Sequence, residues 1–154
     1  MLLSAAIAIA RPLSEVGTNQ SYKAVTNGRT EAGAFAVALA PFAGVSKKPY
    51  APVHLRGVRD SGSGDWALGW VRRSRIGGAW TGGTAVPLGE ASELYEVEIL
   101  NGAAVVRTIT GLTGASVAYT AAQQTTDFGA PQTSLSWRVY QISDAVGRGY
   151  AAAA

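Results

Sequence analysis

The segment from Asp65 to Arg75 constrains the fold more than any other part of the chain. Its sequence is DWALGWVRRSR, in which Trp66, Leu68 and Trp70 recur at every second residue. Side chains with this spacing share one face of a β-strand. Each tryptophan removes roughly 150–250 Å² from water when it is buried, so this face needs an opposing layer to cover it. The segment therefore predicts a strand in the core of a β-sandwich.

Similar alternation recurs about every ten residues beyond Pro52, which is typical of a seven-stranded antiparallel sandwich. The clearest example is the run from Tyr95 to Ile99, in which apolar residues alternate with two glutamates. The predicted core consists of the inward-facing residues of these strands, which are Leu55, Leu68, Trp70, Tyr95, Val97, Ile99, Leu135, Trp137 and Val139.

Turn signals separate the predicted strands. Asn101-Gly102 predicts a two-residue hairpin turn, with residues 103–109 as the returning strand. Residues 123–132 are polar and predict a connection, with a helical turn as the open alternative. We expect the terminal alanines to be frayed, since nothing in their sequence fixes them.

Residues 1–48 predict a separate, β-rich docking segment ahead of a domain at 49–152. The boundary is the polar stretch from Gly44 to Pro52, which is bracketed by prolines. The apolar runs Leu2–Ala10 and Ala34–Ala40, and the short run Tyr22–Val25, are the expected strands of the docking segment. A signal peptide is the alternative for the first run, but no basic residue precedes Arg11, so a buried strand is favoured.

The composition narrows the classes of function. Charged residues make up 15% of the 154 residues, against roughly a quarter in an ordinary soluble domain, which suits a protein packed against neighbours. The net charge of +3 is small for a nucleic-acid binder. The absence of cysteine excludes disulfides and thiolate metal sites. No segment is long enough to predict a membrane span.

No catalytic, cofactor or metal site is predicted, and we expect the protein not to be an enzyme. The single histidine, His54, lies on the polar side of a strand with no spacing motif to supply a partner. Asp60, Asp65 and Asp127 are expected in loops, but their spacing matches no calcium loop. The glutamates Glu96 and Glu98 are interpreted as the solvated outer face of a strand.

The candidate contact residues are arginines and one tryptophan. Arg56, Arg72, Arg73 and Arg75 are expected near one edge, where they would meet acidic partners or phosphate groups; the alternative is a solvated edge that discourages aggregation. Trp80 lies in a glycine-flanked loop. It is either a stacking platform or interface anchor, or it folds back to cap the sandwich.

The order of these features resembles a fibronectin type III domain. The resemblance is carried by Pro52-Val53-His54-Leu55, by Leu68-Gly69-Trp70, by Tyr95-Glu96-Val97-Glu98-Ile99 and by Leu135-Ser136-Trp137-Arg138-Val139 with its Gly-x-Gly exit at 147–149. It implies a two-sheet sandwich. The family usually has a tyrosine at the position of Leu135, so we expect the corner there to be fixed by other contacts.

Longer phrases are similar to the C-terminal region of phage and gene transfer agent tail-tip proteins, known as baseplate hub or host-specificity proteins. They are Pro49–Arg56, Trp70–Ile76, Val86–Glu90 and Tyr119–Gln124. This resemblance implies a structural protein at the distal end of a virion tail, in a trimeric arrangement with hub, distal tail and fibre proteins. The alternative is a module that contacts a host receptor or glycan through the loop around Trp80. The resemblance implies no cofactor.

Overall fold

The computed structural model describes residues 12–22, 25, 27, 28, 30, 32, 38–77 and 86–154. The chain divides into two compact units, Met1–Ser46 and Lys47–Ala154. The division falls two residues before the boundary expected from the sequence, within the same proline-bracketed stretch.

The first unit contains a small antiparallel sheet. Strand β1 (Asn19–Tyr22) pairs with β2 (Ala38–Pro41), and the short 3-10 helices η1 (Leu13–Glu15) and η3 (Val45–Lys47) lie at the two ends of the described chain of this unit. The strand predicted at Leu2–Ala10 lies outside the described residues, as does most of the one predicted at Ala34–Ala40. A short strand was expected at Tyr22–Val25. The strand observed in this region, β1, lies earlier in the chain, at Asn19–Tyr22.

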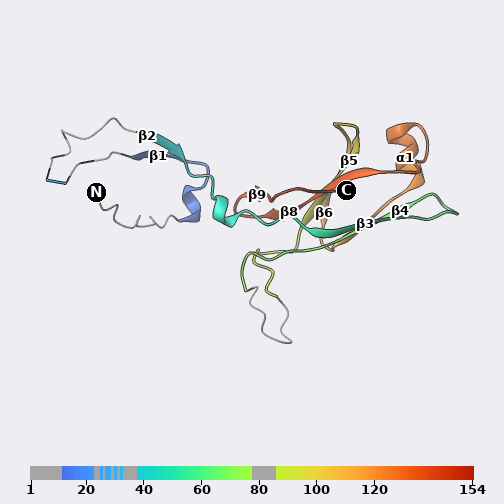
Figure 1. Ribbon diagram of the computed structural model, residues 1–154, viewed down its shortest axis with the longest axis horizontal. Helices are drawn as coiled ribbons and strands as arrows, with labels where there is room; N and C mark the ends of the chain where they lie inside the picture. The colour runs from blue at the N-terminus through green and yellow to red at the C-terminus, as the bar shows by residue number, and fades with distance from the viewer. Residues whose placement is uncertain are drawn as a thin grey trace. The chain divides into compact units, whose positions relative to one another are not determined.

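The second unit is a sandwich of two antiparallel sheets (Figure 1). Strands β3, β4 and β7 form one sheet, and β10, β8, β5 and β6 the other, with β9 also paired to β8. Their bounds are β3 Val53–Arg59, β4 Trp66–Val71, β5 Tyr95–Asn101, β6 Ala104–Leu112, β7 Ser116–Tyr119, β8 Ser136–Ser143, β9 Gly147–Arg148 and β10 Ala152–Ala153.

The strand order confirms the predicted all-β, fibronectin type III-like sandwich. Strands β9 and β10 lie along the same edge of β8, with Arg148 opposite Ile142 and Ala152 opposite Val139. They are two halves of one interrupted edge strand, so the described residues of this unit form seven strands. The interruption occurs at Gly149, where a side chain would come within 2.8 Å of two backbone carbonyl oxygens.

The predicted core residues lie between the two sheets. Leu68, Trp70, Tyr95, Val97, Ile99, Trp137 and Val139 are buried, while Leu55 and Leu135 are partly buried against them. The ring of Trp70 packs edge-on against Tyr95, with 5.2 Å between ring centroids, and lies 6.1 Å from Trp137. Tyr119 is fully buried in the same cluster, although it was not among the predicted core residues.

Three local predictions need correction. Asn101 is the last residue of β5 and pairs with Ala104, so the turn residues are Gly102 and Ala103; Gly102, with φ +60°, supplies the one positive φ that a type II′ turn needs. The polar connection contains a helix, α1 (Ala121–Phe128). The C-terminal alanines are not frayed at the backbone, because Ala154 exchanges two hydrogen bonds with Trp137.

Helix α1 supplies the contacts that fix the corner before β8, where this chain has Leu135. Gln124 is fully buried, and its amide donates to the carbonyl oxygens of Gly64 (3.0 Å) and Tyr119 (3.1 Å) while accepting from the backbone N–H of Gln132 (2.8 Å). One side chain therefore joins the β3–β4 turn, the end of β7 and the start of the connection to β8. Such fully satisfied buried polar contacts hold a single arrangement.

Candidate functional site

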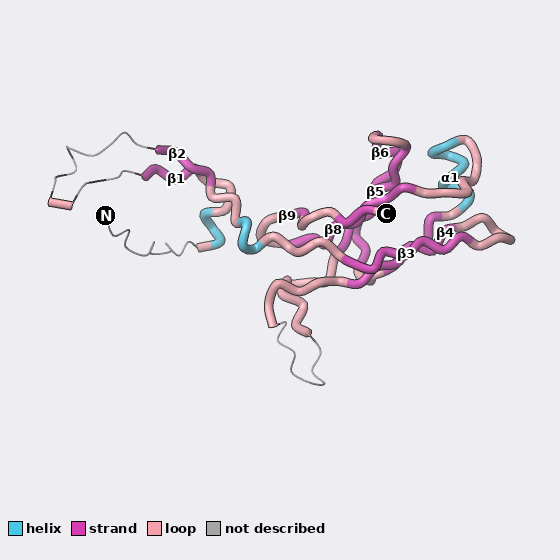
Figure 2. The backbone as a smooth tube through the Cα atoms, in the orientation of Figure 1, coloured by secondary structure: helices cyan, strands magenta, loops and turns pink. Residues whose placement is uncertain are grey.

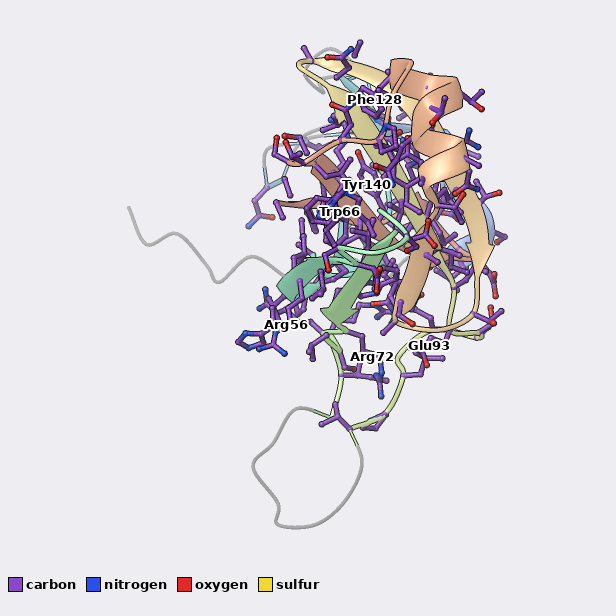
Figure 3. The ribbon with its side chains drawn as sticks, turned by 90° about the vertical axis from the view of Figure 1, so that its right-hand side faces the viewer. Arg56, Trp66, Arg72, Glu93, Phe128 and Tyr140 are labelled. Atoms are coloured by element: carbon purple, nitrogen blue, oxygen red, sulfur yellow. The ribbon has the colours of Figure 1, made fainter. Side chains whose placement is uncertain are left out.

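The candidate contact residues lie at the end of the sandwich where β4 leads into the long connection to β5. Figure 3 shows Arg56, Arg72 and Glu93 near this end, away from Phe128. The structure gives each predicted arginine a different environment, and Trp80 lies outside the described residues.

Arg72 and Arg75 join the two legs of this connection. The guanidinium of Arg72 donates to the carbonyl oxygens of Pro87 (3.0 Å) and Val86 (2.7 Å). Arg75 donates to the carboxylate of Glu90 (2.9 Å) and to the carbonyl oxygen of Gly89 (2.8 Å). Both arginines therefore hold the two legs together. Figure 2 shows the backbone of the legs leaving the sandwich side by side.

Glycine allows the legs to approach closely. Gly77 has φ +65°, and a Cβ there would lie 2.7 Å from the ring of Pro87. Gly89, with φ +78°, faces Ile76 and Ser74 in the same way, where a Cβ would lie 3.2 Å from each. With the arginine contacts, this packing makes residues 72–77 and 86–90 a defined base for the residues between them.

Arg73 and Arg56 have no carboxylate partner among the residues that the structure describes. Arg73 lies over the ring of Tyr50, with 5.1 Å between the guanidinium and the ring centroid, a cation–π contact. Arg56 is exposed on β3 and makes no hydrogen bond or ion pair within the described chain. Of the four predicted arginines, these two remain available to an anionic partner.

A shallow surface hollow lies beside the base, lined among others by Trp70, Arg72, Val86 and Glu93. The carboxylate of Glu93 accepts a hydrogen bond from the hydroxyl of Tyr95 at 2.7 Å. Burial, with this carboxylate as the second cause, raises the pKa of Tyr95 well above its usual value, so the hydroxyl stays a donor. Trp70 lines the hollow but is buried itself, so its ring offers no stacking surface.

The outer face of the β5–β8 sheet carries an ionic network, which corrects the expectation of solvated glutamates. Glu98 is only 4% exposed. Its carboxylate accepts from Arg138, from the hydroxyl of Tyr140 (3.1 Å) and from Arg148 (2.9 Å). Burial alone would raise the pKa of Glu98, but these hydrogen bonds and charges outweigh it and hold the pKa below its usual value. Glu96 pairs with Arg148.

The outer face of the β3–β4–β7 sheet is uncharged except for Arg56. The register places Arg56 opposite Gly69 and Val58 opposite Ala67 on this face, and Ala118 follows on β7. Val58 and Val71 are 64% and 51% exposed. In the register the Arg56–Gly69 pair lies between these two valines, so they are separate exposed apolar residues on a face that also carries one unpaired arginine.

The acidic candidates are structural in the part of the chain that is described. Asp65 accepts from the backbone N–H of Ala121 (2.7 Å) at the start of α1. Asp127, expected in a loop, lies in α1, where its carboxylate pairs with Arg107 and accepts from the hydroxyl of Tyr119 (2.7 Å). No group of three or more histidine, aspartate or glutamate side chains able to hold a metal occurs among the described residues.

A search of the described helices finds none long and apolar enough to cross a membrane.

Comparison with known proteins finds likenesses among solved structures alone. No family model and no curated protein matches the chain. Among solved structures, the crystal structure of the rat CD45 extracellular region, domains d3–d4, is similar over 99% of this chain and 68% of that chain, with a TM-score of 0.49 and 10% sequence identity. The fold assignment rests on the strand order of the chain itself.

Proposed function

We propose that this chain is a non-enzymatic structural component of a phage-like tail tip, part of the baseplate hub or host-specificity assembly at the distal end of the tail. The sandwich is the rigid module, and the chain packs against hub, distal tail and fibre proteins in a threefold arrangement around the tail axis. The proposal begins from the sequence phrases that resemble tail-tip proteins.

The structural observation that supports it is the apolar outer face of the β3–β4–β7 sheet. Val58 and Val71 expose more than half of their surface there, and Arg56 and Gly69 lie between them in the register. Covering such residues is favourable by about 25 cal/mol per Å² of apolar surface. A protein that functions inside an assembly obtains this stabilisation from its neighbours.

Assembly with the other tail-tip subunits tests the proposal. We expect Val58→Glu and Val71→Glu to reduce co-purification with those subunits while leaving the melting temperature of the isolated chain unchanged. Val105→Glu is the matched control, since Val105 is 42% exposed on β6, in the other sheet. Full assembly of both face variants would overturn the proposed contact surface.

A second candidate function is contact with a host receptor or glycan through the loop around Trp80. The observation that favours it is the arginine-held base at residues 72–77 and 86–90, because sites supported by well-ordered surroundings bind more precisely. Binding of the purified chain to host envelope, lost in Trp80→Ala but kept in Trp66→Phe, would support this function. Equal binding by the Trp80→Ala variant would exclude it.

A further inference from the structure

The outer face of the β3–β4 pair contains a second hollow, which adjoins the first and shares Trp70, Val71 and Ala115 with it. It has a volume of about 460 Å³ and is lined by His54, Arg56, Gly69, Trp70, Val71 and Ala115. The volume falls within the usual range of ligand pockets, roughly 300–1,000 Å³. In this hollow the otherwise apolar face has two polar side chains, and both are exposed.

His54 occupies a backbone conformation that favours glycine. Its φ is +52°, and among the described residues it is the only one other than glycine with a positive φ. The register of β3 against β4 shifts by one residue between Val53 and Arg56, so His54 is the extra residue of a β-bulge, at a position where glycine is the usual choice. Such an outlier suggests that the side chain is kept for a role that outweighs its backbone preference.

Gly69 presents the opposite case on the neighbouring strand. A Cβ added there would meet only the carbonyl oxygen of Ala115, at 3.8 Å, which is an ordinary contact, and its φ is not positive. Glycine weakens the interior of a strand, so the packing of the chain itself does not require it. Its effect is to leave the floor of the hollow open.

We propose that this hollow binds one anionic sugar unit. Arg56, which has no partner within the described chain, donates to the phosphate or carboxylate of the sugar, and the imidazole of His54 supplies a second donor. The apolar face of the ring lies over Gly69 and against Val71. A bare anion would leave this apolar floor uncovered, and a neutral sugar would leave Arg56 unpaired.

Titration of the full chain, followed by the backbone amide signals of His54, Gly69 and Ala115, tests the proposal. We expect glucose 6-phosphate and galacturonate to shift these signals with a Kd of about 1 mM, and the stronger of the two identifies phosphate or carboxylate as the preferred group. Glucose and inorganic phosphate at the same concentrations are expected to leave them in place. Equal shifts with glucose or with inorganic phosphate would overturn the assignment.

Three variants separate binding from folding. Arg56→Ala should weaken binding about tenfold or more, as expected for loss of a charge-assisted hydrogen bond, whereas the charge-matched control Lys47→Ala should bind normally. His54→Gly and Gly69→Ala should melt at the same or a higher temperature than the parent and bind about tenfold more weakly. Parent-like binding by His54→Gly and Gly69→Ala would refute the proposal. That result would leave the tail-tip proposal intact, since the latter is tested at Val58 and Val71. Because Val71 belongs to both surfaces, a sugar in the hollow and a subunit on this face would exclude one another.

Discussion

The two outer faces of the sandwich differ in how their side chains are satisfied. On the β5–β8 face, Glu98 is enclosed by two arginines and a tyrosine from β8 and β9. On the β3–β4–β7 face, Val58 and Val71 remain exposed, and Arg56 has no partner in the described chain. The first face forms its contacts internally, whereas these side chains of the second face stay exposed within the described chain.

This difference indicates which face would gain more stability from being covered by a partner. A partner that covers the ionic face would have to desolvate charges that are already paired, which gives little net stabilisation. A partner on the β3–β4–β7 face removes exposed valines from water, but it must also pair Arg56, because an unpaired charge is costly to bury. The asymmetry between the faces therefore directs the proposed contacts to the β3–β4–β7 sheet.

Truncating a side chain of the core, which lies between the two sheets, should lower the free energy of unfolding most. Trp70→Ala deletes a buried ring that contacts Tyr95 and Trp137, and large-to-small changes of this kind cost about 3–5 kcal/mol. Denaturant unfolding measures the loss. A midpoint that barely moves would show that Trp70 is not part of the folding core.

Removing the charge of Glu98 from the ionic face should lower the free energy of unfolding by an intermediate amount. Glu98→Gln keeps the shape of the side chain but removes the charge that Arg138 and Arg148 share, and hydrogen bonds to charged groups contribute about 1.5–3 kcal/mol. The matched control is Asp144→Asn at an exposed position. If the two variants unfold at the same denaturant concentration, the network contributes nothing to stability.

The same network should make the stability of the fold depend on pH in the acidic range. The pKa of Glu98 lies below its ordinary value of 4.5 in the folded chain, so its contribution is complete above about pH 4.5 and is lost as the pH falls through the folded pKa. Asp127, whose pKa is lowered first by the hydrogen bond from Arg107, acts in the same direction below its ordinary value of 3.8.

Unfolding measured from pH 7 to pH 3 tests this dependence. The free energy of unfolding should fall below about pH 4.5, and the fall should be shallower in Glu98→Gln. An identical profile for parent and variant would assign the acid sensitivity to other groups.

Changing the apolar face should have the smallest effect on stability. Val58→Thr at a largely exposed position is expected to alter the free energy of unfolding by less than about 0.5 kcal/mol, because little of the side chain is buried. A loss above 1 kcal/mol, which is about the mean for point variants, would show that the face is already covered within the isolated chain.

Much of the sandwich follows from local patterns. Alternation around Trp70, Tyr95 and Trp137 predicts which side chains face inward, because a strand places every second residue on the same face. The capping box of α1 was also present in the sequence, as Thr120 followed by Gln123, and would have predicted the helix. The prediction of a polar connection at residues 123–132 rests on the polarity of the segment and does not use this capping signal.

The candidate site depends on contacts that no local pattern encodes. Glu98 follows the same alternation as Glu96, yet only the pairing of β8 with β5 and with β9 shows that arginines enclose it. The four basic residues look equivalent in the sequence, but Arg72 and Arg75 hold the loop base whereas Arg56 does not. The φ of His54 depends on the register of β3 against β4, which neighbouring residues do not determine.

The contact between Pro49 and Tyr150 has a mechanical consequence. The backbone N–H of Tyr150 donates to the carbonyl oxygen of Pro49 (3.0 Å), and Lys48 lies over the ring of Tyr150 at 4.6 Å. A pulling force applied ahead of Lys47 reaches this contact before it reaches β3. The edge of the β8 sheet would therefore bear the first load, and the aromatic core would be exposed to tension only after that contact breaks.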